Sequence, residues 1–295
     1  MTQVGFIGLG RMGSGMALRL CAAGVPVVVY DTSAEAVARL VAAGAEAAGS
    51  AREVADKARL VLASLPMPQI VRSVLLDEVA EGRAVKIAVD LSTSGPELAI
   101  ELAAALSAKG IASYDAPVSG GIAGARDGKL SLMASGPEEQ WGEVEAVLSH
   151  FGKVFYMGAA PGAGQTMKLV NNLLGATAIA VTAEGMTFGI KAGLDPARMI
   201  EVLNQSTGIN SGTRDKWPKS VLPRTFDFGF AAALSHKDMR LCVDEAEKLG
   251  VPLPIGSHVR DLLQRTLDEV GADADFTAMT KVVEADAGLD PERKA

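Results

Sequence analysis

The sequence predicts an α/β protein in which an N-terminal Rossmann-type doubly wound parallel sheet is followed by an all-α C-terminal domain, joined by a long interdomain helix. Short apolar strands alternate with Ala-rich helical stretches through the first half, a glycine-rich turn follows the first strand, and the strands stop after about Tyr156. A length of 295 residues favours two domains. Glycine and proline punctuate residues 158–164, so we expect domains at 1–161 and 162–295.

The strands expected in the first domain are short apolar runs bounded by turn or helix signals. They are Gln3–Ile7, Val25–Tyr30, Leu60–Leu65, Val85–Asp90, Ile111–Asp115, Leu130–Ala134 and Val154–Tyr156. The helical stretches expected between them are Met12–Ala22, Ala34–Ala43, Pro96–Lys109 and Pro137–Leu148. Strand–helix alternation of this kind favours a parallel sheet with helices on both faces.

The second domain is expected to be helical. The nearly continuous run of apolar and small residues from Gly164 to Ile190 predicts one long, largely buried helix. Polar residues interrupt this run, so it makes a poor membrane span; they are chiefly Lys168, Asn171, Asn172 and Glu184. Further helical periods are expected at Pro196–Asn204, Lys237–Leu249, Ile255–Glu269 and Phe276–Ala287.

A glycine-rich turn lies directly after the first expected strand. Its sequence matches G-x-G-x-x-G and comprises Gly8, Leu9, Gly10, Arg11, Met12 and Gly13. Alone this spacing is weak, because 32 glycines produce chance matches. Here it precedes an amphipathic helix and a second strand, which is the setting of a dinucleotide site. The first glycine permits the turn, the second lets backbone amides approach a pyrophosphate, and the third lets helix and strand pack closely.

Asp31 closes the second expected strand. A carboxylate at that position can accept hydrogen bonds from a ribose 2′-hydroxyl and repels a 2′-phosphate. Thr32 and Ser33 follow, with no arginine to hold such a phosphate. We therefore expect NAD to be preferred over NADP. An ordinary turn-forming or capping aspartate is the alternative reading.

Lys168 is the most informative residue of the long helix. A buried ammonium costs free energy unless something compensates it. Asn172 lies four residues later and so projects from the same helix face. An amine beside an amide in this way can transfer a proton to or from a substrate oxygen. The alternative is a lysine whose stem covers apolar surface while its head lies in water.

Composition excludes several classes of function. The formal net charge is −7 and no cluster of Lys and Arg occurs, which argues against a nucleic-acid or membrane-surface partner. Cys21 and Cys242 are far apart, and the three histidines form no ligand pattern, so we expect reduced thiols and no metal. No secretory signal is recognisable, and we expect a cytoplasmic protein.

The chain resembles the β-hydroxyacid dehydrogenase family over essentially its whole length, in four separated motifs. These are the glycine-rich GLGRMGSGM from Gly8, DAPVSGG from Asp115, G-x-G-x-x-x-K-x-x-x-N from Gly162 and KDMRL from Lys237. The family includes 3-hydroxyisobutyrate dehydrogenase, tartronate semialdehyde reductase and, more distantly, 6-phosphogluconate dehydrogenase. The family's usual leucine after Lys-Asp is Met239 here.

The resemblance implies roles for these residues. Lys168 and Asn172 would be catalytic, and the substrate would be held by Ser119, Gly120, Gly121 and Lys237. Lys237 would also face the cofactor, and Leu65, Pro66 and Thr93 would line its nicotinamide side. Each has a plainer reading: a flexible turn at 119–121, a solvated Lys237 at a helix start, and Thr93 or Ser94 capping the helix that begins at Pro96. The polar stretch Gly208–Lys216, which we expect to be a loop and which carries Arg214, is expected to influence substrate choice.

We therefore expect an NAD-dependent oxidoreductase that transfers a hydride between nicotinamide and a small 3-hydroxy acid, or its semialdehyde or keto acid. Lys168 would be the general acid–base. The first substrates to consider are 3-hydroxyisobutyrate and glycerate or tartronate semialdehyde, and then succinic semialdehyde. Alternatives are a threonate or serine-type 3-hydroxy amino acid dehydrogenase, an imine reductase, or a non-catalytic cofactor-binding module. The Ala-rich helical half suggests a homodimer or homotetramer.

Overall fold

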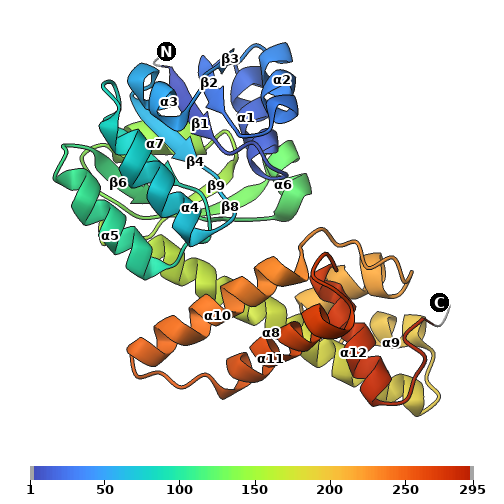
Figure 1. Cartoon of the computed structure of the whole chain (residues 1–295). Coiled ribbons are helices and arrows are strands. Elements are labelled where there is room, and N and C mark those ends of the chain that lie inside the picture. The colour runs from blue at the N-terminus through green and yellow to red at the C-terminus, as the bar shows by residue number, and fades with distance from the viewer. Residues whose placement is uncertain (1–2, 293–295) are drawn as a thin grey trace. The chain divides into compact units, whose positions relative to one another are not determined.

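The computed structural model describes residues 3–292 and divides into two compact units between Lys168 and Leu169. The division lies within the long helix, beyond the boundary expected at residue 161. Each unit is described by itself below, with the elements labelled in Figure 1.

Unit 1 contains a six-stranded parallel sheet with the strand order β3-β2-β1-β4-β5-β6. Its strands are β1 (Val4–Ile7), β2 (Val27–Tyr30), β3 (Glu46–Ala47), β4 (Leu60–Ala63), β5 (Ile87–Asp90) and β6 (Ala112–Asp115). This is the strand order of a dinucleotide-binding doubly wound sheet, in which β1 and β4 meet at the point where the order reverses. The predicted Rossmann-type sheet is confirmed.

Helices cover both faces of this sheet (Figure 1). They are α1 (Gly13–Ala22), α2 (Ala34–Ala42), α3 (Ala51–Lys57), α4 (Pro68–Ser73), α5 (Pro96–Ser107), α6 (Gly121–Asp127) and α7 (Trp141–Leu148), with a π-helix η1 (Val74–Glu78) and a 3-10 turn η2 (Val79–Glu81). Successive strand residues alternate between two cores: Phe6 packs with α1, α2 and α7, whereas Ile7 packs with α3, α4 and α5. The central strands β1, β2 and β4 are buried on both faces, so their sequences are nearly continuously apolar, whereas the edge strand β3 is exposed.

Two expected strands lie in a different sheet. Leu130–Ala134 is β8 and pairs in parallel with β9 (Gly152–Tyr156) and antiparallel with β7 (Val118–Ser119). A single bridge between Asp115 and Ser135 connects this small sheet to the end of β6. The short strands β3 and β7 and the helices α3, α4 and α6 were not predicted, because they are too short to show a period.

Unit 2 is helical in its described part, as predicted. The 29-residue α8 (Ala163–Lys191) enters it from unit 1. The other helices are α9 (Pro196–Leu203), a π-helix η3 (Gly212–Val221), α10 (Ala232–Lys248), α11 (Pro254–Glu269), a 3-10 turn η4 (Phe276–Ala278) and α12 (Met279–Asp286). One core joins them, with Ile179 and Met186 of α8 packed among residues of α10, α11 and α12.

By length and composition α8 is able to cross a membrane, but 44% of its apolar window is buried within the protein. The core helix of a globular protein passes the same test of length and composition. The polar residues named above also interrupt its sequence. We therefore interpret α8 as a core helix.

Candidate active site

The glycine-rich turn has the shape that a pyrophosphate requires. Gly8 has φ +90°, and a Cβ there would lie 2.2 Å from the Ser64 carbonyl oxygen. A Cβ at Gly13 would lie 1.9 Å from the carbonyl oxygen of Gly8. At Gly10, by contrast, a Cβ would meet no described atom within 4 Å. The first and third glycines therefore let the chain pack tightly, and the middle one leaves its backbone open to a ligand.

The other residues of the turn divide between core and surface. Leu9 is fully buried in the core beside α1, whereas Arg11 is exposed and Met12 is half-buried. The first turn of α1 carries no acidic residue. Its positive end and its backbone amides are therefore suited to an anion.

Asp31 fastens this turn to the end of β2. One carboxylate oxygen accepts a hydrogen bond from the Leu9 amide at 2.5 Å, and the other accepts one from the Ser33 amide at 2.7 Å. Ser33, not Asp31, caps α2, because its hydroxyl accepts from the Ala36 amide. The capping alternative for Asp31 is therefore wrong, and the turn-forming one describes its bond to Ser33. Each carboxylate oxygen has a second lone pair with which to accept a ribose hydroxyl.

A buried carboxylate, that of Asp90, holds the segment around Thr93 in place. Asp90, 2% exposed, accepts hydrogen bonds from the Ser92 amide at 2.9 Å and the Ser94 hydroxyl at 2.6 Å. The Ser92 hydroxyl in turn accepts from the Leu65 amide at 2.9 Å. Gly95 is the N-cap residue of α5, and the Ser94 hydroxyl donates to Asp90, so neither Thr93 nor Ser94 occupies the N-cap position itself. These bonds bring the Leu65 and Thr93 segments together, and Pro66 is exposed; their contact with a nicotinamide stays a prediction.

Gln165 is a functional candidate that the sequence did not reveal. It is fully buried, and its Oε1 accepts from the amides of Ser94 (3.1 Å) and Gly95 (3.2 Å) while its Nε2 donates to the Ser92 carbonyl (2.9 Å). Gln165 therefore clamps the Thr93 segment to the first turn of α8, one turn before Lys168. The only signal in the sequence was its position between Gly164 and Lys168 of the third motif, where no rule assigns a role to a glutamine.

Asp115, the first residue of the DAPVSGG motif, also holds the first turn of α8 in place. Its carboxylate accepts from the amides of Gly162 and Gln165, both at 2.8 Å, and from the Ser135 hydroxyl at 2.6 Å. A carboxylate on these amides is favourable at a helix N-terminus. Gly164 is required here, since a Cβ would lie 2.1 Å from the Met133 carbonyl oxygen.

Burial governs the protonation of the two carboxylates in this network. It raises the pKa of Asp90 to about 6, although hydrogen bonds from Ser92 and Ser94 oppose it. Burial also raises the pKa of Asp115, against its hydrogen bonds from Ser135, Gly162 and Gln165. Low dielectric surroundings penalise the charged form of each acid.

The Ser119–Gly121 segment forms a tight turn between β7 and α6. Gly120 has φ +133° and Gly121 φ +65°, a region that favours glycine. A Cβ at Gly120 would also come within 3.0 Å of Leu130, whereas Gly121 opens to free space. The turn is therefore defined by its backbone, and successive amides in such a turn suit a carboxylate.

Lys168 is buried, with 8% of its surface exposed, which argues against a lysine whose head lies in water. It lies on the continuous helix α8, one turn before Asn172. The two side chains therefore project from one face of the helix, as the sequence predicted.

Asn172 belongs to a polar cluster within unit 2. Its Nδ2 donates to the Asp238 carboxylate at 2.6 Å, and its Oδ1 accepts from Asn171 at 3.1 Å. Asp238 also pairs with the Lys237 amine at 3.1 Å. An amide nitrogen carries two hydrogens, so the second can donate to a substrate oxygen. Asp238, which was not among the predicted site residues, fixes the direction in which Asn172 points.

Two expectations for unit 2 are wrong. Lys237 was read as the start of a helix and as solvated on the plain reading, yet α10 begins at Ala232 and Lys237 is only 8% exposed. The polar stretch Gly208–Lys216 was read as a loop, but a π-helix begins at Gly212 within it. Arg214 is exposed there and pairs with Asp215 at 2.8 Å. Its contribution to substrate choice stays a prediction.

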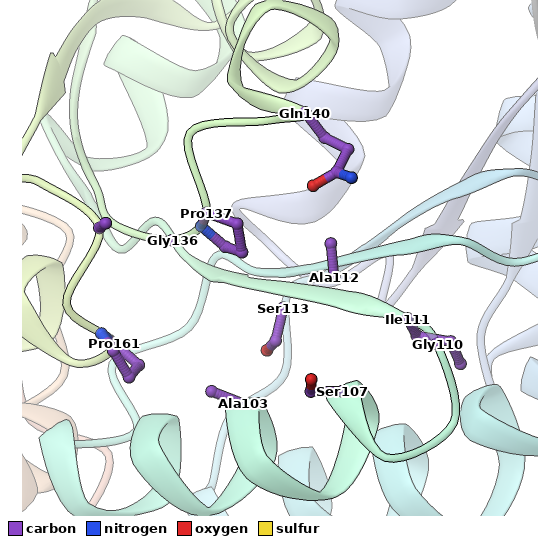
Figure 2. Close-up of a pocket in the computed structure, with 11 residues that line it drawn as sticks. Ala103, Ser107, Gly110, Ile111, Ala112, Ser113, Gly136, Pro137, Gln140 and Pro161 are labelled. Carbon is purple, nitrogen blue, oxygen red and sulfur yellow. The ribbon is translucent and has the colours of Figure 1, made fainter.

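A cavity of about 390 Å³ lies elsewhere in unit 1, and no predicted site residue lines it. Figure 2 shows it between the end of α5, the start of β6 and the turn that contains Pro137 and Gln140. Within residues 3–292, no group of three or more His, Cys, Asp or Glu side chains is arranged to hold a metal ion.

Comparisons with known proteins agree with this architecture. Residues 3–158 match the family model of the NAD-binding domain of 6-phosphogluconate dehydrogenase. Residues 162–283 match a family model described as NAD-binding of NADP-dependent 3-hydroxyisobutyrate dehydrogenase.

Similar proteins match along nearly their whole length. A 3-hydroxyisobutyrate dehydrogenase of Pseudomonas aeruginosa is 37% identical, over 96% of this chain and 98% of the relative. An NAD-dependent L-serine dehydrogenase of the same organism is 35% identical, over 98% of this chain and 100% of the relative. A solved 3-hydroxyisobutyrate dehydrogenase of Mycobacterium tuberculosis with L-serine superimposes with a TM-score of 0.89, at 32% identity over 96% of this chain and 99% of that one.

Proposed function

Because the chain belongs to the β-hydroxyacid dehydrogenase family, we propose that it oxidises a small 3-hydroxy acid with NAD, or reduces the matching semialdehyde or keto acid. The observation that carries this proposal is a buried lysine on α8, one turn before an asparagine whose amide Asp238 orients. Burying an amine costs free energy, and a role in catalysis would offset that cost.

The residues at the glycine-rich turn fit a dinucleotide. Gly10 leaves space above its backbone, α1 offers its positive end, and Asp31 closes β2 with a carboxylate. When bound, the nicotinamide supplies hydride transfer to and from the substrate carbon. Leu65 and Thr93 would border the nicotinamide side, in a segment that Gln165 clamps to α8.

Oxidation of an alcohol releases a proton as well as a hydride. Lys168, as the neutral amine, would accept the hydroxyl proton, and it would return that proton in the reverse direction. Asn172 would donate to the same oxygen, and the Ser119–Gly121 amides would hold the substrate carboxylate. Lys237 would contribute a positive charge that favours an anionic substrate. Oxidative kcat should therefore rise with pH as Lys168 loses its proton.

Asp31 supports a preference for NAD. Its carboxylate would accept from the ribose 2′-hydroxyl and would repel a 2′-phosphate. Relatives are described with both cofactors, as the NAD-dependent serine dehydrogenase and the NADP-dependent family model illustrate. The ratio of kcat/KM for NAD over NADP tests this point, and a clear NADP preference would overturn it.

The substrates that we favour are 3-hydroxyisobutyrate and glycerate or tartronate semialdehyde. A second candidate is L-serine, because an NAD-dependent L-serine dehydrogenase is 35% identical and a solved relative is described with L-serine. 3-Hydroxyisobutyrate and L-serine each carry a carboxylate and a hydroxyl on the third carbon, and serine also carries an ammonium group.

A screen for NADH production over short 3-hydroxy acids tests the proposal. The panel should contain 3-hydroxyisobutyrate, glycerate, L-serine and threonate, with Lys168→Ala as the inactive control. Turnover of one acid by the wild type but not the variant is expected. Cofactor binding without turnover of any of them would point instead to a non-catalytic module.

We also propose that the chain forms a homodimer or homotetramer through unit 2. Leu174 (65% exposed), Val181 (54%) and Phe188 (77%) recur every seven residues on α8 and so lie on one side of the helix. Large apolar side chains in such a row are typical of a covered surface. Phe188→Glu should lower the mass measured by light scattering, whereas an unchanged mass would contradict assembly through this face.

A further inference from the structure

Lys216 is a second buried lysine, and the reaction proposed above does not use it. It lies on the π-helix η3, and 8% of its surface is exposed. π-Helical turns are rare and often occur at functional sites. The position therefore calls for a physical explanation of the buried charge.

The surroundings of the Lys216 amine are neutral. Its one hydrogen bond to a described residue goes to the Ser211 hydroxyl, at 2.7 Å. The rings of Phe228 and Phe276 lie 5.8 Å and 6.0 Å from it, at the outer limit for a cation–π contact. An ammonium has three hydrogens to donate, so a single hydroxyl leaves most of its capacity unused.

The carboxylate of the adjacent residue, Asp215, forms no ion pair with this amine. Asp215 is already paired with Arg214 at 2.8 Å and with Lys219 at 3.5 Å, both on the exposed side of the π-helix. Burial accordingly lowers the pKa of Lys216 to about 8, while Asp215 acts to raise it and Arg214 to lower it. Among the described residues, the charged form therefore has no carboxylate in an ion pair with it.

The frame around the amine is rigid. The Asn210 Oδ1 accepts from the Gly212 amide at 2.6 Å, and Gly212 packs so closely on α8 that a Cβ would lie 2.5 Å from the Thr182 hydroxyl. On the aromatic side, the Asp275 carboxylate accepts from the amides of Gly229 (2.7 Å) and Phe230 (3.0 Å). Both walls are thus fixed before any ligand binds, which lowers the entropy cost of binding.

We propose that Lys216 and Ser211 form an anion-binding subsite in unit 2 for the carboxylate of a small organic acid. The ammonium supplies the charge, and the Ser211 hydroxyl keeps its own hydrogen to donate to a second carboxylate oxygen. The Phe228 ring, 39% exposed, gives the aliphatic part of the acid an apolar wall that solvent reaches. The acid is either the distal carboxylate of the substrate itself or a separate metabolite, and the chemistry of recognition is the same for both.

Calorimetric titration of the full-length protein with succinate tests the subsite without any turnover, so its result does not depend on the proposed dehydrogenase activity. Lys216→Met should weaken succinate binding by about 10- to 100-fold, the usual worth of a hydrogen bond to a charged group. Ser211→Ala should weaken it several-fold. The matched control is Lys219→Met, which removes a lysine of the same helix whose side chain is 65% exposed and should leave binding unchanged.

Proton linkage gives a second readout. An amine whose pKa is about 8 is charged at neutral pH and mostly neutral near pH 9.5. Succinate affinity of the wild type should therefore fall about tenfold or more over that range, and Lys216→Met should lose this dependence. The Lys216→Arg variant, which stays charged, should bind at both pH values. Circular dichroism of each variant separates a lost site from a lost fold.

Kinetics with a monocarboxylic 3-hydroxy acid identify the source of the anion. If the subsite holds the distal end of the substrate, succinate raises KM without changing kcat, and dicarboxylic substrates lose affinity in Lys216→Met. If it holds a separate acid, succinate changes kcat in the wild type and not in Lys216→Met. Equal succinate binding by wild type and Lys216→Met, or no binding by the wild type at millimolar succinate, would overturn the proposal.

Discussion

The candidate residues of unit 1 and those of unit 2 form two groups that are built differently. In unit 1 the cofactor side is made of backbone: three glycines of one turn, with Asp31, Asp90, Asp115 and Gln165 holding main-chain amides in place. In unit 2 the polar cluster is made of side chains on two helices, where Asp238 contacts both Asn172 and Lys237. Backbone geometry is therefore critical for the residues of unit 1, and side-chain charge is critical for those of unit 2.

This difference predicts different failures. A substitution that alters backbone geometry in unit 1 should damage folding or cofactor affinity, because the atoms that act there are amides. A substitution of a charged side chain in unit 2 should slow turnover and leave the fold intact. The chain has two tryptophans, Trp141 in α7 and Trp217 in η3, so each unit carries its own fluorescent reporter.

The largest effect is expected for Gly8→Ala. A methyl group there meets the Ser64 carbonyl oxygen at 2.2 Å in a left-handed backbone, which should destabilise unit 1 by about 3 kcal/mol or more. Gly10→Ala meets nothing within 4 Å. It should fold normally but bind NAD about tenfold or more weakly, because the methyl group occupies the space above the amides.

Urea unfolding followed by Trp141 fluorescence, together with NAD titration, measures the contrast between these glycines. Gly142→Ala is the control, because Gly142 lies in α7 with nothing within 4 Å of an added Cβ. It should be neutral or slightly stabilising, as expected for alanine in a helix. Normal NAD affinity in Gly10→Ala would contradict the assignment of this turn to the pyrophosphate.

Gln165→Met should destabilise unit 1 by about 2 to 3 kcal/mol, because it orphans two buried amides and a carbonyl that the glutamine now pairs. It should also lower kcat more than it raises KM, since it loosens the Thr93 segment from the turn that precedes Lys168. Thr166→Ala alters an exposed neighbour in the same turn and serves as the control. A Gln165→Met enzyme with unchanged kcat would reduce the glutamine to a packing residue.

The buried Asp90 should make stability depend on pH. Its pKa of about 6 lies above the ordinary value of 3.8, so the unfolded chain releases this proton at lower pH than the folded chain does. The contribution of Asp90 to the free energy of unfolding should therefore fall by about 2 kcal/mol as pH rises from about 4 to about 6, and stay level above that.

Urea titrations of wild type and Asp90→Asn across this range isolate the effect, with Trp141 fluorescence reporting on unit 1. The difference in unfolding free energy between the two proteins should change with the predicted sign. If the unfolding free energies of the two proteins changed with pH in parallel, folding would not raise the pKa of Asp90.

The smallest effect is expected for Asp238→Asn, which should reduce kcat about tenfold through the orientation of Asn172. The fold should persist, because an amide of the same size replaces the carboxylate. Asp244→Asn, on an exposed face of the same helix, should have no effect. A wild-type kcat in Asp238→Asn would mean that Asn172 is oriented without the Asp238 carboxylate.

The contrast between backbone in unit 1 and side chains in unit 2 also explains which residues could be predicted from the sequence. Gly8, Gly10 and Gly13 were identified from their spacing after a strand, because positive φ and close approach leave few other residues possible. Lys168 and Asn172 stood out as polar residues within an apolar helix. Gln165 and Asp238 did not, since their roles depend on partners 71 and 66 residues away in the chain. The start of α10 was missed because its N-cap residue is Ala231, which has no side chain that could cap the helix and mark its beginning.

The account depends most on proton transfer by Lys168, and kcat of Lys168→Ala, measured beside NAD affinity, tests it most directly. We predict that kcat falls by about 100-fold or more while the Kd for NAD stays within about twofold of wild type. Lys191→Ala, an exposed lysine at the other end of α8, should retain full kcat. A Lys168→Ala enzyme that turns over its 3-hydroxy acid at nearly the wild-type rate would contradict the mechanism.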